Sequence, residues 1–584
     1  MYGFFNRLLR VDLTRSSFAY EEIPDSLLRR SLGGKGLGAA LLMKENPVGV
    51  DPLATAAVFI LTVGPLTGTK VWGSSRFGAF AKSPATGGYG ESYCGGSLAG
   101  QLKGCGIDAV ILTGRCEDLS FLLIDEKGPT FLDASSLRGR DTVETEEHLL
   151  GKSHPGARAL VIGPAGEQLS AIACIKSDRW RSLGRGGLGA VLGSKNIKGV
   201  SFAGNLHAVV ADEALLMDVN KRVAAKGKIT PATERYQRLG TPMQVAVTNN
   251  AKCFPTRYWK GGVFEKWDHL SADYMQEHFK VKACGCPLCF MHCTKNSVIQ
   301  EGRHSGLEVE GPEYETIYAL GGLNAIDSLE EVAWLNDVCD RLGIDTMSAG
   351  NLSSFAVEAY KAGKTDFPID YNQPDRMAEL FTMIATGQGL GKILGKGIKS
   401  ASRQLGLSDI AIHVKGLEPA GFDPRTLKGM ALSYATSARG ACHLRGTFYK
   451  AELSGEVDGR PEGMALHHID YEDRAALFDS MILCRFFRDL IMWEELADLI
   501  QASMGLSLTR TELQLQANWI TELTRAYNHR EGLGPETDTL PKRFLTEATV
   551  EGKSLDDKVL SGLIGDYNEI RTSRLAAYGQ GLVV

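Results

Sequence analysis

The chain has 584 residues, which is enough for three or four domains and a large buried core. Its 64 Lys and Arg residues stand against 69 Asp and Glu residues, a net charge of −5 without a basic region, which argues against nucleic-acid binding. No apolar run reaches the ~18 residues of a membrane span, and the N-terminus lacks the apolar core of a secretory signal, so we expect a cytoplasmic protein without a membrane span.

Residues 1–210 are predicted to be β-rich. Short apolar or alternating runs at 58–64, 107–114, 119–125, 159–163 and 169–175 are bounded by Gly, Pro and Asp, as strands usually are. The chain has 67 glycines where about 40 are expected at the usual frequency, and this region is rich in them. The region is therefore built to turn tightly, or to let a ligand approach its backbone closely.

From residue 211 the pattern changes to amphipathic stretches of helix length, at 212–225, 328–342, 353–362, 375–385 and 475–487. Ser328 before acidic residues is typical of a capped helix start. A Gly- and Pro-rich stretch at 416–424 suggests a further boundary. We therefore expect an α+β protein with three domains: a β-rich domain at 1–210, and mainly helical domains at 211–417 and 418–584.

Four of the twelve cysteines lie within ten residues, at Cys284, Cys286, Cys289 and Cys293. Cysteines that serve as small hydrophobes have no reason to repeat at this spacing, so the segment is predicted to bind a metal or a cluster. Zinc is one candidate, with His292 completing a local site. The other is an iron–sulfur cluster held by three of these cysteines and a distant fourth.

The segment 179–189 places several glycines between arginines. Gly184, Gly186 and Gly189 match a dinucleotide fingerprint, but charged residues precede them where such a site needs an apolar strand. Backbone N–H groups exposed by these glycines, with Arg181 and Arg185 beside them, suit a phosphate-bearing ligand. The alternatives are a nicotinamide site and a plain stack of turns with solvated arginines.

Together these segments resemble the tungstopterin aldehyde:ferredoxin oxidoreductase family over essentially the whole chain. Residues 6–14 and 33–38 are similar to the family's opening segment, and 73–86 and 184–187 are similar to its two pterin-contacting loops. The resemblance implies a tungsten ion held by two pterins on a base formed by the β-rich domain. It also implies a [4Fe–4S] cluster, and a Mg²⁺ ion that bridges the pterin phosphates near Tyr93 and Leu183.

The family carries two copies of a motif Asp-x-x-Gly-Leu-Cys, one for each pterin. Asp340, Gly343 and Asp345 match the first copy, with Asp345 where the family allows Cys or Asp. The segment 479–484 matches the second, with Ile482 at the usual glycine position. The aspartates are implied to accept hydrogen bonds from pterin N–H groups.

The resemblance assigns a role to each candidate site residue. The cluster ligands are Cys286, Cys289, Cys293 and Cys484, which leaves Cys284 as a non-ligand and makes zinc a minor alternative. Arg76 and Cys484 are implied to lie between a pterin and the cluster. The pterin-binding positions are Arg76, Tyr93, Leu183, Gly184, Arg185, Gly186, Asp340, Gly343, Asp345, Arg445, Asp479 and Leu483.

The resemblance also implies the reaction, in which an aldehyde or its hydrate is oxidised to the carboxylic acid. Glu315, with Glu313 as second choice, would manage the proton of water or hydrate, and His443 would polarise the carbonyl oxygen. Thr241 would line the substrate channel. Phe422, where a tyrosine can occur, favours an aromatic or alkyl aldehyde over a small hydrated one.

The electrons are implied to pass through the cluster to ferredoxin or to an iron–sulfur partner subunit, and the chain is expected to form a homodimer or a hetero-oligomer. One alternative is a dearomatising acyl-CoA reductase subunit of the same family, although the further cysteine that such subunits place near the metal has no clear candidate here. Alternatives of other classes are a nicotinamide dehydrogenase and a zinc-stabilised binding module.

Overall fold

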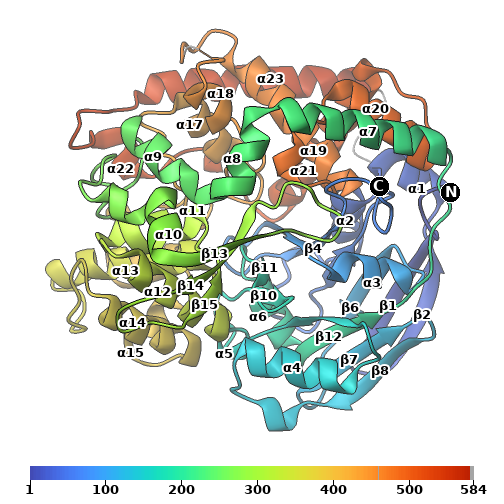
Figure 1. The fold of residues 1–584 in the computed structure, drawn as a ribbon, viewed down its shortest axis with the longest axis horizontal. Coiled ribbons are helices and arrows are strands. Elements are labelled where there is room, and N and C mark those ends of the chain that lie inside the picture. The colour runs from blue at the N-terminus through green and yellow to red at the C-terminus, as the bar shows by residue number, and fades with distance from the viewer. Residues whose placement is uncertain (458, 579–584) are drawn as a thin grey trace.

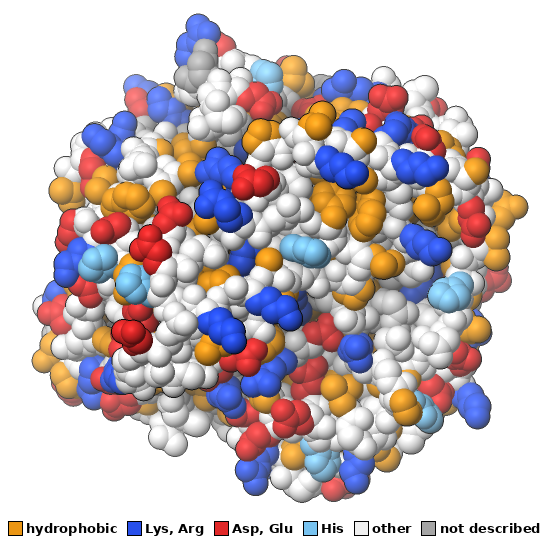
Figure 2. Space-filling view, viewed as in Figure 1, with side chains coloured by type: hydrophobic (Ala, Val, Ile, Leu, Met, Phe, Trp, Pro, Cys, Tyr) orange, Lys and Arg blue, Asp and Glu red, His pale blue; other side chains and the backbone are white. Residues whose placement is uncertain are grey.

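The computed structural model describes residues 1–457 and 459–578. Two six-stranded sheets occupy the first 203 residues, and the remainder is mainly helical apart from one three-stranded sheet. Figure 1 shows the two sheets at the lower right, the C-terminal helices in orange and red above, and the helices of residues 329–394 at the lower left. In Figure 2 acidic and basic side chains are interspersed over the same face, as the near-balanced composition predicts.

The first sheet has the strand order β2-β1-β6-β3-β4-β5, in which β1 and β6 are parallel and the other neighbours antiparallel. Its strands are β1 (Arg7–Asp12), β2 (Ser17–Glu22), β3 (Phe59–Thr62), β4 (Arg76–Lys82), β5 (Tyr89–Gly95) and β6 (Ala109–Thr113). Alternate side chains point to opposite faces. Leu8 and Ile60 therefore pack against α2 (Gly34–Glu45) and α19 (Met464–Met481), whereas Leu9 and Phe59 face the second sheet.

The second sheet has the order β11-β10-β9-β12-β7-β8. Its strands are β7 (Ser120–Asp125), β8 (Gly128–Asp133), β9 (Arg158–Val161), β10 (Ile175–Ser177), β11 (Arg181–Leu183) and β12 (Ile197–Ala203). One face shares a core with the first sheet, and α4 (Thr142–Lys152) packs on the other. The short strands β10 and β11 end where the glycine segment begins, so the sheet presents that segment at its edge.

Four of the five predicted strands are confirmed, as β3, β6, β7 and β9. The prediction of a strand at 169–175 is wrong. Leu169 has a left-handed φ of 57°, and the segment makes only an isolated bridge, from Ala173 to Ile344, before β10 begins. Its backbone contacts the first aspartate motif instead of joining a ladder, and the N–H of Cys174 donates to the carbonyl of Gly343 at 2.9 Å.

The first 210 residues also contain helices that the sequence prediction omitted. They are α1 (Asp25–Ser31), α2, α3 (Leu98–Gly104), α4, α5 (Pro164–Glu167) and α6 (Leu188–Ser194). Helix α2 is buried along nine of its twelve residues, and α6 along its whole length. A helix that is buried all round shows no amphipathic period, which is why the pattern did not reveal it.

The predicted helices after residue 211 are largely confirmed. They correspond to α7 (Glu213–Ile229), α12 (Leu329–Leu342), α13 (Thr346–Lys361) and α14 (Pro374–Thr386). Ser328 caps α12 by accepting a hydrogen bond from the N–H of Glu331. The single helix predicted at 475–487 is wrong in its second half, because α19 ends at Met481, Ile482 takes a φ of 62°, and a separate turn, η7 (Arg485–Phe487), follows.

Helix α19 is almost completely buried and lies among α2, α20 (Trp493–Met504), α21 (Arg510–Arg530) and α23 (Asp557–Tyr578). The other elements named below are α8 (Pro231–Leu239), β13 (Phe279–Cys284), β14 (Thr294–Ile299), β15 (Glu308–Glu310), α11 (Tyr314–Thr316) and α17 (Lys428–Thr436). Within the described residues, no helix combines the length and the apolar character that crossing a membrane requires.

Candidate active site

A cavity of about 390 Å³ lies between the N-terminal sheets and the helical part of the chain. Strands β4 and β5 and the glycine segment after β11 form one wall, and α8, α11, and the loops around residues 439–449 and 479–488 form the others. Ten predicted site residues line it: Arg76, Tyr93, Gly184, Arg185, Glu313, Glu315, His443, Arg445, Asp479 and Cys484. Thr241 and Phe422 line it as well, so segments from the whole length of the chain converge here.

The two predicted aspartate motifs have the same backbone conformation, in which a helix reaches its C-terminal cap three residues after the aspartate. Asp340 lies in the last turn of α12, which ends at Gly343 with a φ of 72°. Asp479 lies in the last turn of α19, which ends at Ile482 with a φ of 62°. Ile482 therefore adopts the left-handed conformation that glycine usually supplies at a helix end, and the chain follows the same path in both copies.

Each motif is attached to the N-terminal region by a backbone hydrogen bond five residues after its aspartate. The N–H of Asp345 donates to the carbonyl of Ile172 at 3.0 Å, and the N–H of Cys484 donates to the carbonyl of Gly73 at 2.9 Å. The two acceptors belong to different sheets' loops. The two motifs are therefore joined to the N-terminal region in the same way, each at a loop of a different sheet.

Side chains make the same two connections between a motif and a loop of the N-terminal region. Arg185, from the second glycine-bearing loop, donates from Nε to Asp345 at 3.1 Å. Arg76, from the first, places Nη1 3.9 Å from Sγ of Cys484. The cavity thus has two halves, each built from one motif and one loop. This arrangement suits a pair of similar ligands.

Both aspartates are buried and held by cations. Asp340 accepts from Nζ of Lys176 at 2.6 Å, and burial raises its pKa although Lys176 opposes the shift. Asp479 accepts from Arg445 at 2.6 Å and from Arg485 at 2.7 Å. The cavity lining does not include six predicted pterin-binding residues: Leu183, Gly186, Asp340, Gly343, Asp345 and Leu483. Leu183 and Leu483 are core residues, so their side chains anchor the loops that carry them.

A buried charge network behind the cavity was missed in the sequence. Glu91 on β5 is 1 % exposed and accepts hydrogen bonds from Lys35 at 2.9 Å, from Arg445 at 2.7 Å, and from the hydroxyls of Tyr89 and Tyr93. Burial alone would raise the pKa of Glu91, but the cations lower it far below its ordinary value. The one signal was an acidic residue within a strand that is otherwise buried.

Glu315 and His443 face each other across the cavity wall. Nε2 of His443 lies 3.4 Å from Oε1 of Glu315, whose other oxygen accepts from the N–H of Gly421 at 3.0 Å. Burial raises the pKa of Glu315 to about 8, and burial together with neighbouring arginines lowers the pKa of His443 well below its ordinary value. At neutral pH the pair is therefore a protonated carboxyl beside a neutral imidazole, which can exchange protons with a ligand.

Glu313 has a different environment. Its carboxylate accepts from the hydroxyl of Thr241, and it lies on the side of the cavity near Cys293 and Lys295. Burial raises its pKa. The structure therefore brings Glu315, and not Glu313, to the histidine.

The four predicted cluster cysteines lie close enough to influence one another. The charge of Cys484 raises the pKa values of Cys286, Cys289 and Cys293, in addition to the larger effect of burial. Cys284 ends strand β13, and its thiol contacts the carbonyl of Lys282. In the part of the chain that the structure describes, no group of three or more Cys, His, Asp or Glu side chains is placed to hold a metal ion.

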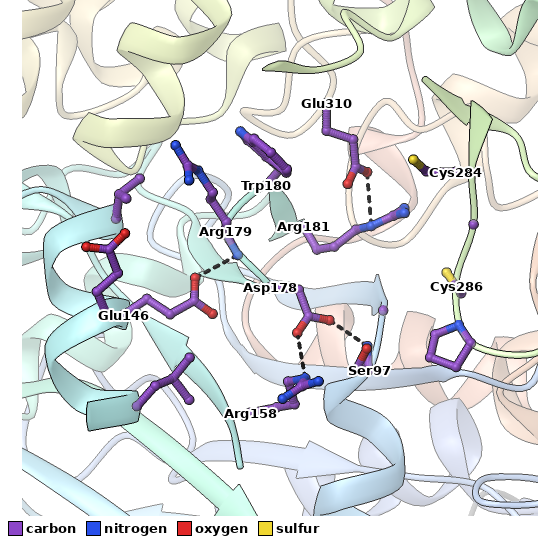
Figure 3. A pocket seen from close by; sticks show the side chains of 16 residues that line it. Ser97, Glu146, Arg158, Asp178, Arg179, Trp180, Arg181, Cys284, Cys286 and Glu310 are labelled. Carbon is purple, nitrogen blue, oxygen red and sulfur yellow. Dashed lines mark hydrogen bonds and ion pairs between the residues drawn. The ribbon is translucent and has the colours of Figure 1, made fainter. Parts of the chain in front are cut away.

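The cysteine loop also borders a surface pocket of about 450 Å³. Figure 3 shows Cys284 and Cys286 on one side of it, with the guanidinium of Arg181 extending toward them and paired with Glu310 at 3.0 Å. The pocket further contains Trp180. Cys286, one of the four predicted cluster ligands, is therefore close to the protein surface.

The cavity fits an anionic ligand that accepts hydrogen bonds. The Nε atoms of four arginines that line it are buried and make no hydrogen bond to a described residue: Arg439, Arg445, Arg485 and Arg488. A Cβ added at Gly184 would meet nothing closer than Ser182, at 3.8 Å, so the backbone there is open to a ligand. Pterin phosphates and ring carbonyls have this chemistry, so the residues present fit the implied cofactor.

Comparisons with known proteins cover nearly the whole chain. Residues 8–204 match the family model described as the N-terminal domain of aldehyde ferredoxin oxidoreductase, and residues 217–572 match that of its domains 2 and 3. The tungsten-containing aldehyde ferredoxin oxidoreductases of Pyrococcus furiosus and Thermococcus kodakarensis are each 32 % identical, over 98 % of this chain and 96 % of theirs.

More distant similarities extend over the same length. An aliphatic sulfonate oxidoreductase, the WOR-like subunit from Pyrococcus furiosus, is 26 % identical over 97 % of this chain and 94 % of its own. The solved active-site complex BamBC of benzoyl coenzyme A reductase, bound to 1,5-dienoyl-CoA, has a TM-score of 0.84 at 21 % identity, covering 99 % of this chain and 97 % of that one. At that identity the likeness shows the fold.

Proposed function

We propose that this chain, which belongs to the aldehyde ferredoxin oxidoreductase family, oxidises aldehydes to carboxylic acids at a tungsten ion held by two pterins. The two family models together span most of the chain, and membership makes the protein a tungsten-family oxidoreductase. The observation that carries the choice of reaction is the pair of Glu315 and His443 on the cavity wall. Aldehyde oxidation needs a proton to be managed beside the redox centre, and this pair can do so.

The two halves of the cavity would each hold one pterin. One half offers Arg185 with the segment of Asp340 and Asp345, and the other offers Arg76 with Asp479. The backbone carbonyls of Tyr93 and Leu183 would help to hold a Mg²⁺ ion beside the pterin phosphates, since this ion prefers phosphate and carbonyl oxygens. When bound, the tungsten supplies the two-electron redox chemistry. The residues of this chain would position the substrate and exchange protons with it.

His443, as a neutral imidazole, would donate a hydrogen bond to the carbonyl oxygen of the aldehyde. Glu315, in its ionised form, would receive the proton that water or the aldehyde hydrate gives up, and its second oxygen is fixed by the N–H of Gly421. Phe422 and Tyr449 stack with ring centroids 4.0 Å apart beside the histidine and would exclude water from the reacting carbon. Thr241, through Glu313, shapes the far side of the channel.

Cys286, Cys289, Cys293 and Cys484 would hold a [4Fe–4S] cluster, which when bound would supply an electron path to ferredoxin or an iron–sulfur partner subunit. Arg76 supports this path, because it contacts Sγ of Cys484 and donates to the carbonyl of Tyr93 at 3.3 Å. The partner would dock over the surface pocket beside Cys286. None of the twelve cysteines forms a disulfide, which suits the reducing cytoplasm. We also propose assembly as a homodimer or a hetero-oligomer.

The three-part organisation at 1–210, 211–417 and 418–584 is part of the same proposal: a base for the pterins, a domain with the cysteine loop and the first motif, and a domain with the second motif. The acyl-CoA reductase alternative shares the fold. The aldehyde oxidoreductases share more of the sequence over the same length, which favours the aldehyde reaction.

The test is a steady-state assay of the anaerobically purified holoenzyme on a panel of aldehydes, with a low-potential viologen as acceptor. Glu315→Gln and His443→Ala are each expected to lower kcat by about two to four orders of magnitude with tungsten content unchanged. Glu452→Gln is the matched control, because Glu452 is a half-buried carboxyl with a pKa of about 7 that does not line the cavity. Full activity in both site variants would contradict the proposed acid–base roles.

A further inference from the structure

A buried loop beside the acid–base pair has no regular backbone structure. Residues 418–422 lie between an isolated bridge at Leu417 and helix α17, and they form neither helix nor strand. All five residues are buried. Their carbonyls cannot join a ladder, and a buried carbonyl without a partner is costly. Side chains of other elements must therefore hold this loop.

Two tyrosines on consecutive turns approach the loop from one side. Tyr314, on α11, donates a hydrogen bond from its hydroxyl to the carbonyl of Gly421. Tyr318, on the following turn η4 (Ile317–Gly321), donates to the carbonyl of Pro419 at 2.5 Å. A Cβ added at Gly421 would lie 2.6 Å from the ring of Tyr318, so the loop packs tightly against these side chains.

A third tyrosine binds the loop from α17. The hydroxyl of Tyr434 lies 3.0 Å from the carbonyl oxygen of Ala420 and 3.2 Å from that of Phe422, so its single proton is shared between the two. Four consecutive carbonyls, at 419–422, are therefore each in contact with a tyrosine hydroxyl. We call Tyr314, Tyr318 and Tyr434 the tyrosine clamp; none of the three is more than 2 % exposed.

The clamp meets the acid–base pair at Gly421. Glu315 follows Tyr314 on α11, and its Oε2 accepts the N–H of Gly421 at 3.0 Å, while Tyr314 holds the carbonyl of the same residue. This N–H lowers the pKa of Glu315 against the larger, opposite effect of burial. Other charged or titratable groups that interact with Glu315 are Arg185, Asp345, Cys442, His443 and Tyr449.

We propose that the tyrosine clamp positions the acid–base pair, because it holds the loop whose N–H at Gly421 fixes the carboxyl of Glu315. This inference rests on the proposed function, in which Glu315 exchanges the proton. Burial raises the pKa of each clamp tyrosine well above its ordinary value, so the hydroxyls remain donors over the pH range of an assay. Loss of one donor lets the loop relax and weakens the bond from Gly421, which favours the ionised carboxyl.

Tyr434→Phe is the most informative variant, because Tyr434 does not line the cavity and the change keeps its ring. In the holoenzyme, the rise of kcat near pH 8 is expected to move upward by roughly 0.5 to 1 pH unit. At pH 7 kcat should fall about threefold to tenfold, with the plateau at high pH within about twofold. Tyr567→Phe is the matched control, since this buried hydroxyl donates to Glu472 outside the cavity and its loss should leave the midpoint unchanged.

Infrared spectroscopy tests the clamp without turnover. In the oxidised holoenzyme, the absorption of the protonated carboxyl that is absent in Glu315→Gln is followed against pH, and its midpoint is expected to rise in Tyr434→Phe. Tyr318→Phe should shift it in the same direction, and it replaces Tyr434→Phe if that variant does not fold. An unchanged midpoint in the clamp variants, an equal shift in Tyr567→Phe, or a loss of kcat that is the same at every pH would overturn the proposal. A wild type that oxidises no aldehyde would contradict the proposed function, while the infrared titration would still decide on the clamp.

Discussion

Glu315 is a side chain whose charge is set by its surroundings. Burial raises its pKa to about 8, so the carboxyl is protonated at neutral pH and becomes ionised as the pH rises through that value. If the carboxylate receives the proton of the hydrate, kcat for aldehyde oxidation should rise as the pH rises through about 8. Glu315→Gln should abolish the rise. A pH–rate profile of both forms checks this, and a rise that survives in the variant would show that another group titrates.

Ile482 shows two opposing effects at one residue. Its left-handed backbone costs about 1–2 kcal/mol relative to glycine, but its side chain is 1 % exposed and packs against Gly34 and Gly64. Loss of a buried isoleucine side chain costs about 2–5 kcal/mol, so packing outweighs strain. Ile482→Gly is therefore expected to lower the free energy of unfolding by about 1–3 kcal/mol in chemical denaturation, after both contributions are combined.

The reciprocal change is the control. A Cβ at Gly343 would approach the backbone nitrogen of Gly163 to 2.8 Å, so Gly343→Ile is expected to destabilise the chain more than Ile482→Gly does. An Ile482→Gly variant more stable than the wild type would mean that strain dominates at this position.

At the scale of elements, Glu91 links β5 to α2 and to the loop of Arg445. Glu91→Gln removes the charge that balances Lys35 and Arg445, and an uncompensated buried charge is strongly destabilising. Because Arg445 also holds Asp479 at the cavity, we expect this variant to lose pterin and tungsten. Pterin content, measured by fluorescence after oxidation, and tungsten content check the result.

Glu531→Gln is the matched control for Glu91→Gln. Its carboxylate is fully buried and paired with Lys82 at 2.6 Å, outside the cavity. It should keep its pterins. Equal cofactor loss in both variants would indicate general destabilisation instead of a specific effect on the cavity.

The sequence predicted elements where one face is polar, and it predicted site residues where several fall within a short motif. Helix α12 and the cysteine loop are examples. It did not reveal α2, which is buried all round, or that residues 169–175 would contact Ile344 instead of joining a ladder. The sequence also did not predict contacts between distant segments, such as the ion pair of Lys176 with Asp340. Spacing along the chain carries no information about contacts that form only on folding.

At the scale of the whole molecule, the C-terminal helix α23 packs against α19, the helix that carries the second motif. Arg571 on α23 is 1 % exposed and pairs with Asp473 at 2.6 Å and Glu472 at 2.5 Å on α19, the helix that carries Asp479. Arg571→Met leaves both carboxylates buried without this partner, so the free energy of unfolding should fall by about 3–5 kcal/mol. Chemical denaturation measures the change.

Arg574 provides the comparison, since it pairs with Asp473 at 2.6 Å but is 21 % exposed in its side chain. Arg574→Met is expected to cost much less, because solvent screens that pair. Equal losses in the two variants would show that burial of the ion pair does not decide the effect.

The proposed active site draws on segments between residues 73 and 484: the two halves of the cavity, the cysteine loop and the acid–base pair. One chain must therefore assemble all of them around one tungsten centre and one cluster. Elemental analysis of anaerobically purified protein tests this most directly. We predict about one tungsten and about four iron atoms per chain, with the iron lost in Cys484→Ser and kept in Cys284→Ser. Zinc without iron or tungsten in the wild-type protein would contradict the account.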